Sequence, residues 1–176
     1  MVTWSDIRRW NSAAFQPVLE ALAEDRKRVL RAHWELECSD TSQDWQGKTA
    51  DLAAARRVQL QERCQVLVDA IDALIAATTK AQSGTYAVEL TVSEACSIAD
   101  QYGFEILGSG QVADASDDRA QPTEDPEDFP RNLAELTARL NALERTQKVV
   151  ELALQKAEKV DRMYSEALGN AVQGGI

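Results

Sequence analysis

The side chains that most often carry chemistry are few and widely spaced in this sequence. The three cysteines, Cys38, Cys64 and Cys96, contain no C-x-x-C pair, and His33 is the single histidine. A zinc site needs more ligands than these, and a cysteine nucleophile needs a base held beside it. Because Cys64 and Cys96 fall on apolar helical stripes, where a free thiol behaves as a small hydrophobe, we predict no metal site and no cofactor.

The sequence motifs of common enzymes are missing as well. There is no Gly-x-Ser-x-Gly, no glycine-rich phosphate loop and no metal triad. Carboxylates such as those of Glu35 and Glu37 could act as acids or bases, but such charges far more often lie solvated on a helix surface. We therefore predict that the chain has no catalytic residues and is not an enzyme.

The composition is that of a soluble, acidic chain. Of its 176 residues, 44% are hydrophobic and 27% are charged, and the net charge is −10. Phosphate binding needs a basic surface, so we expect no nucleic-acid partner. No apolar run is long enough to span a bilayer, and Met1–Asp6 lacks the layout of a cleavable signal peptide. We predict a cytoplasmic location without membrane insertion, or secretion by a route that needs no such peptide.

Two long segments with apolar residues at helical spacing predict an antiparallel helical hairpin. The first helix begins near Asn11 or Ser12, tolerates Pro17 in its first turn, and runs to about Glu37. The second begins after Gly47, and a short polar connection joins the two. The apolar face of the first helix consists of Ala14, Val18, Ala21, Leu22, Val29, Ala32 and Leu36. The apolar residues that we expect to pack back ahead of it are Trp4, Ile7 and Trp10.

The second predicted helix is unusually long. A glycine inside a helix costs about 1 kcal/mol, and we favour one helix that continues through Gly84 and ends at Gly103 over a break near Thr85. The segment 104–112, centred on Gly108-Ser109-Gly110, is typical of a minimal β-hairpin. The stripe that we expect this helix to bury consists of Ala50, Ala53, Ala54, Leu60, Cys64, Leu67, Val68, Ile71, Leu74 and Ile75, with Arg56 and Arg57 outside it.

The last third of the chain combines an acidic stretch with a regular helix. Residues 113–130 contain seven acids and one base, which predicts a flexible linker. Residues 131–169 predict a long amphipathic helix, followed by a flexible tail at 170–176. Its stripe, which faces either the core or a partner, is formed by Leu133, Leu136, Leu140, Leu143, Val150 and Leu154. Such a helix must lie along the hairpin or along a second chain.

These elements predict an all-α fold. We expect a long antiparallel helical hairpin, extended to a bundle of three or four helices, with the minimal β-hairpin near 104–112. Residues 1–112 form the hairpin domain with its extension, and 113–130, 131–169 and 170–176 are the linker, the long helix and the tail.

Trp45-Gln46-Gly47 lies between the two helices of the predicted hairpin. Glycine permits a tight turn or a positive φ there, and the indole of Trp45 can cover the open end of the helices. This tripeptide between long helices, with Ala50 and Ala54 following, resembles the WXG (ESX-type) proteins of actinobacterial type VII secretion. The stretch Ala99–Ile106, followed by Gly108-Ser109-Gly110 and an acidic linker, is similar to the longer relatives.

The resemblance implies a protein-interaction module that acts as a type VII secretion substrate or adaptor. It also implies a protein partner, either a second copy or a small helical WXG-like protein, with Trp45 and Gly47 as the hairpin-tip motif. One feature departs from the family, because none of Tyr86, Tyr102 and Tyr164 begins a Tyr-x-x-x-Asp/Glu export motif. The alternatives are the N-terminal targeting domain of a larger toxin or hydrolase effector, and a coiled-coil spacer unrelated to secretion.

Overall fold

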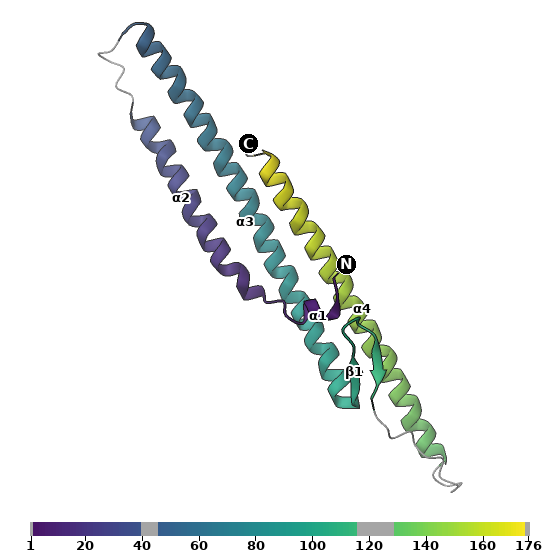
Figure 1. Ribbon diagram of the computed structural model, residues 1–176. Coiled ribbons are helices and arrows are strands. Elements are labelled where there is room, and N and C mark those ends of the chain that lie inside the picture. The colour runs from purple at the N-terminus through teal and green to yellow at the C-terminus, as the bar shows by residue number, and fades with distance from the viewer. Residues whose placement is uncertain (1, 40–45, 116–128, 175–176) are drawn as a thin grey trace. The chain divides into compact units, whose positions relative to one another are not determined.

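The computed structural model describes residues 2–39, 46–115 and 129–174 (Figure 1). The elements in chain order are α1 (Trp4–Ile7), the 3₁₀ helix η1 (Ser12–Phe15), α2 (Gln16–Cys38), α3 (Lys48–Tyr102), β1 (Phe104–Ile106), β2 (Val112–Asp114) and α4 (Phe129–Gly174). The predicted fold class is confirmed: the chain is about 85% helical, with helices packed together and a small antiparallel β-hairpin.

The chain forms two compact units. Unit 1 consists of Met1–Ser12 and Ser83–Asp161, and unit 2 consists of Ala13–Gln82 and Arg162–Ile176. Both α3 and α4 contribute residues to each unit.

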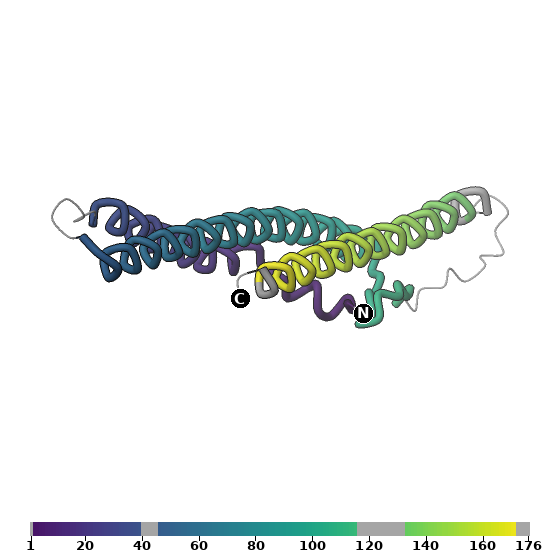
Figure 2. The backbone as a smooth tube through the Cα atoms, turned by 90° about the horizontal axis from the view of Figure 1, so that it is seen from above, coloured from purple at the N-terminus to yellow at the C-terminus, as the bar shows by residue number. Residues whose placement is uncertain are grey.

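A glycine with a positive φ lies directly before and directly after the long helix α3. It begins after Gly47, which has a φ of +109° and whose carbonyl accepts hydrogen bonds from the amides of Ala50 and Asp51. It ends before Gly103, whose φ of +70° is the left-handed conformation that commonly terminates helices. Between them α3 runs unbroken for 55 residues (Figure 2), so the predicted continuity through Gly84 is confirmed.

The core of unit 1 is built on α1. Trp4 and Ile7 are each 1% exposed and pack with residues of α3 and α4. Thr3 and Asp6 form a reciprocal capping box at the start of α1, and the hydrogen bonds from Thr3 hold the pKa of the Asp6 carboxyl below its ordinary value. The core partners of α1 are Val88, Ala95, Val150, Ala153 and Ala157. The expectation that the N-terminal segment packs back on the helices is thus confirmed for Trp4 and Ile7.

The predicted β-hairpin is present and lies on α4. β1 and β2 pair in antiparallel register, with Ile106 opposite Val112. The Val112 amide donates to the Gln147 side-chain oxygen at 3.0 Å. Gly110 approaches α4 so closely that a Cβ there would lie 2.9 Å from Leu154 Cδ1. Two strands this short are marginal alone, and this packing on α4 holds them.

The predicted linker, 113–130, differs from the structure at its start and at its end. Ala113 and Asp114 belong to β2 rather than to a linker, because they pair with Glu105 and Phe104 of β1. Asp114 also accepts two hydrogen bonds from Arg139 at 2.6 and 2.7 Å. The Arg139 guanidinium also lies over the Phe104 ring, 5.1 Å from its centroid. Residues 116–128 of the predicted linker lie outside the described residues, and Phe129 and Pro130 belong to α4 (Phe129–Gly174).

The helix α4 is longer than predicted at both ends. It begins at Phe129 and continues to Gly174, so residues 170–174 of the predicted tail are helical. No proline or glycine interrupts Asn170–Gln173, and Ala171 is half-buried. Packing of a side chain in the last turns stabilises the helix there, because most helical stability in proteins comes from tertiary contacts.

Small side chains let α3 and α4 approach closely in unit 1. A Cβ on Gly84 would lie 2.5 Å from Val160 Cγ2, which places α4 directly over the glycine. The hydroxyl of the buried Thr146 donates to the Ala142 carbonyl at 2.7 Å, so burial leaves it paired. The buried residues on the two sides are Thr85, Val88, Thr91, Ala95 and Ala99 on α3, and Ala142, Thr146, Val150, Ala153 and Ala157 on α4.

In unit 2, helix α2 contains no buried residue. Arg26 donates to Asp72 of α3, with Nη2 3.0 Å from Oδ2, and this holds the pKa of Asp72 below its ordinary value. Tyr164 meets Phe15 edge to face at 5.7 Å. The residues of this side that are half-buried are Phe15, Leu19, Leu22, Ala23, Arg26, Val29, His33 and Leu36. The predicted face was therefore wrong for Ala14 of η1 and for Val18, Ala21 and Ala32 of α2, which are exposed. Only one narrow stripe of this segment is half-buried.

Candidate protein-interaction surface

The first turns of α4 present three leucines to solvent. Leu133, Leu136 and Leu140 are 53%, 51% and 58% exposed. Their spacing of three and four residues puts them on one helix face, which we name the leucine stripe. Figures 1 and 2 both show this end of α4 extending past the last turn of α3 in unit 1, and every described side chain from Leu133 to Ala138 is exposed.

The rest of the predicted α4 stripe lies elsewhere. Val150 is fully buried in the unit 1 core, while Leu143 and Leu154 are half-buried and pack against core clusters. The structure therefore divides the six predicted residues into an exposed group of three and an inward group of three. The exposed group is the part that a partner could cover.

The predicted hairpin-tip motif is described only in part. Trp45 lies outside the described residues. Gly47 is exposed, and its φ of +109° is one that other residues rarely adopt. The role of both residues as a binding motif remains a prediction. A different tryptophan, Trp34 of α2, is 61% exposed in unit 2.

A second exposed surface, on α3 in unit 2, was not predicted. Near the end of α4 a cavity of about 450 Å³ is lined by Val66, Asp69, Ala70, Ala73, Ala167, Asn170 and Ala171. One face of α3 carries four residues at intervals of seven: Arg56, Arg63, Ala70 and Ala77. The two alanines are half-buried.

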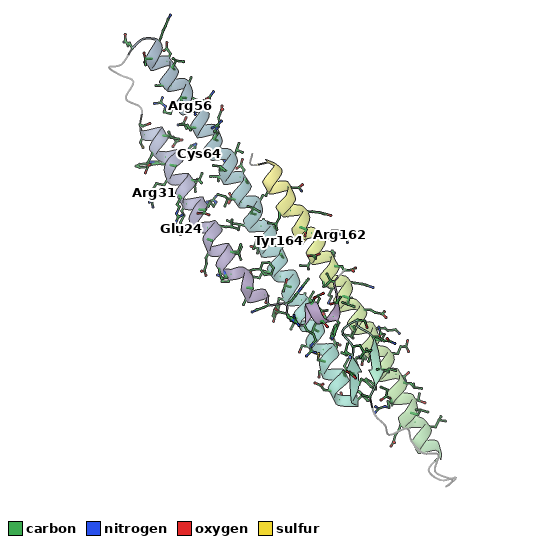
Figure 3. All side chains as sticks on the ribbon, viewed as in Figure 1. Glu24, Arg31, Arg56, Cys64, Arg162 and Tyr164 are labelled. Carbon is green, nitrogen blue, oxygen red and sulfur yellow. The ribbon has the colours of Figure 1, made fainter. Side chains whose placement is uncertain are left out.

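This face continues beyond the described end of α4. Ala171 lines the cavity opposite Ala70, and only three more residues of α4 follow, about one turn. Both views show α4 ending before the first turns of α3, and Figure 3 locates Arg56 in those turns. We name this surface the open face of α3. Its members are Leu52, Arg56, Arg63, Val66 and Leu67. The three apolar members are well exposed: Leu52 to 71%, Val66 to 51% and Leu67 to 43%.

The chemistry-bearing side chains remain dispersed. Cys38 is exposed, Cys64 and Cys96 are half-buried, and all three are free thiols. Among the described residues, no group of three or more His, Cys, Asp and Glu side chains could hold a metal ion. Within the same residues, no helix is both long and apolar enough to cross a membrane.

The cysteines should differ in reactivity. Burial raises the pKa of the Cys96 thiol, and the thiolate is the reactive form. We expect iodoacetamide at neutral pH to modify the exposed Cys38 several-fold faster than Cys96, as followed by peptide mass spectrometry after timed quenching. Unfolding in guanidinium should remove the difference. Equal rates in the folded protein would contradict this description of the two sites.

Comparisons with known proteins give no further guide to these surfaces. No model of a protein family, no curated protein and no solved structure matches the chain.

Proposed function

We propose that this chain is a non-enzymatic helical protein-interaction module whose leucine stripe is covered by a helical surface of a partner protein. The observation that carries the proposal is the exposure of Leu133, Leu136 and Leu140 on one face of α4. Burial of a leucine side chain contributes about 1.5–3 kcal/mol, and about half of each side chain remains to be buried. The stripe therefore offers roughly 3 kcal/mol to a partner.

The form of the stripe indicates the mode of binding. Apolar residues at i, i+3 and i+7 are the anchors of a helix that lies in a groove or along another helix. The stripe follows a stretch, 113–130, with seven acids and one base. Anionic membrane surfaces repel such a stretch, so a protein surface is the better-matched partner.

The resemblance to WXG proteins suggests the class of partner. Trp45-Gln46-Gly47 precedes α3 directly, and the positive φ of Gly47 starts that helix. Within the proposal, the partner is a second copy or a small helical WXG-like protein. The chain then serves as a type VII secretion substrate, an adaptor, or the targeting domain of a larger effector.

Replacement of all three leucines by serine tests the proposal. For Leu133→Ser/Leu136→Ser/Leu140→Ser we expect about a hundredfold weaker association with a second copy or with a purified small helical partner, the equivalent of about 3 kcal/mol. Sedimentation velocity or calorimetry gives the dissociation constant, and circular dichroism checks that helix content is retained.

The matched control is Leu152→Ser, because Leu152 is also exposed on α4 but does not belong to the leucine stripe. This variant should bind as the unaltered chain does. An unchanged dissociation constant for the triple variant would remove the leucine stripe from the proposed function.

A further inference from the structure

The open face of α3 combines apolar and basic side chains in an acidic protein. Arg56 and Arg63 are exposed, and Leu52, Val66 and Leu67 flank them. Residues 48–67 contain four bases and two acids, whereas the whole chain has a net charge of −10. A local excess of positive charge beside apolar side chains selects an acidic, apolar partner.

The open face is a poor match for a copy of itself. Two such faces in contact would bring Arg56 and Arg63 of both chains together, and juxtaposed like charges disfavour association. The surface that covers this face must therefore bring carboxylates as well as apolar side chains.

The same chain carries a segment with both properties. Residues 116–128 contain six acids and one base, and the leucine stripe follows within the next twelve residues. The two surfaces have the same length. Arg56 and Arg63 are seven residues apart, as are Leu133 and Leu140, and seven residues rise about 10 Å along a helix. One heptad of the open face can therefore pair with one heptad of the leucine stripe.

We propose that the open face of α3 binds the acidic segment and leucine stripe of a second copy of this chain. The leucines cover Leu52, Val66 and Leu67, and carboxylates of residues 116–128 neutralise Arg56 and Arg63. This inference rests on the proposed function, since the leucine stripe provides its apolar half. It adds the identity of the partner and the surface on which the stripe docks.

A charge-exchange experiment on the full chain tests the pairing. At low salt, light scattering should give the unaltered chain at least twice its monomer mass of 19.4 kDa. The mass should fall towards the monomer at about 1 M salt, where the Debye length is about 3 Å. Arg56→Glu/Arg63→Glu and, separately, Glu124→Lys/Asp125→Lys/Glu127→Lys/Asp128→Lys should each be monomeric. An equimolar mixture of the two variants should recover the larger mass, because each reversed surface then meets its complement.

The control for the net charge of the double arginine variant is Lys159→Glu/Arg162→Glu, which makes the same charge change at exposed sites on α4 outside both surfaces (Figure 3 labels Arg162). This variant should associate as the unaltered chain does. A monomeric unaltered chain at low salt, a mixture of the two variants that stays monomeric, or an equal loss in the control would each overturn the pairing.

The two proposals fail separately. If the triple leucine variant loses association but the charge-exchanged mixture remains monomeric, docking on α3 is wrong and the interaction role of the leucine stripe stands. If the charge-exchanged mixture assembles while the triple leucine variant associates normally, the leucine stripe is wrong and only the electrostatic half of the pairing remains.

Discussion

Replacement of Trp4 by alanine is expected to lower the free energy of unfolding by about 3–5 kcal/mol, the cost of removing a large buried aromatic side chain. The Trp4 side chain is 1% exposed and packs with Val88 and Val150, so it joins α1 to α3 and α4 in unit 1. Its loss leaves a cavity between three elements of the core. Guanidinium titration followed by circular dichroism measures the change.

Trp34 provides a matched control for this variant. It undergoes the same chemical change, tryptophan to alanine, but its side chain is 61% exposed on α2. Trp34→Ala should change the free energy of unfolding by no more than about 0.5 kcal/mol. Equal losses for the two variants would contradict the placement of Trp4 in the core.

The second large effect is expected at Gly84. A methyl group there would lie 2.5 Å from Val160 Cγ2, and the branched side chain of Val160 has little rotamer freedom in a helix. Overpacking of this kind costs about 1–3 kcal/mol, whereas alanine in place of glycine returns about 1 kcal/mol of helix propensity. We expect Gly84→Ala to lower the free energy of unfolding by up to about 2 kcal/mol in the same titration.

Two further variants separate the clash from helix propensity. Gly169 lies in α4 with no atom within 4 Å of an added Cβ, so Gly169→Ala should be neutral or stabilising by up to about 1 kcal/mol. Val160→Ala in the Gly84→Ala background should recover part of the loss, because it removes the contacting methyl groups. If Gly84→Ala is as stable as Gly169→Ala, the close approach of α3 and α4 is wrong.

The elements of the fold were largely predictable because their signals are local. Gly47 and Gly103 mark the ends of α3 through backbone conformations that glycine favours, and Pro17 lies in the first turn of α2. The glycines of the segment 104–112 marked the β-hairpin in the same way. Each of these features depends on residues close in sequence.

The packing of α4 was not predictable in the same way. The predicted stripe chose Leu136, Leu140 and Leu154 because leucines recur along the helix in a pattern close to seven residues. The structure buries Ala142 and Ala153 instead, since α4 lies against a seam of small residues on α3. The predicted stripe and the buried stripe of α4 share Val150 but lie on different faces of the helix. Hydrophobicity alone cannot show how closely two helices approach.

The open face of α3 was missed for a related reason. In the sequence, Arg56 is a charged residue outside an apolar stripe, which is typical of a solvated face. It becomes part of a candidate binding surface because the exposed Leu52, Val66 and Leu67 lie beside it on α3. The relation of Asp114 to Arg139, 25 residues apart, likewise depends on how the chain folds back.

Hydrogen–deuterium exchange of the full chain at two protein concentrations tests whether the two surfaces cover each other. We expect peptides covering residues 52–67 and 133–140 to exchange at least tenfold more slowly at high concentration. The buried residues around Val88 should exchange alike at both concentrations. Equal exchange of those two segments at low and high concentration would contradict the claim that the leucine stripe and the open face of α3 cover each other.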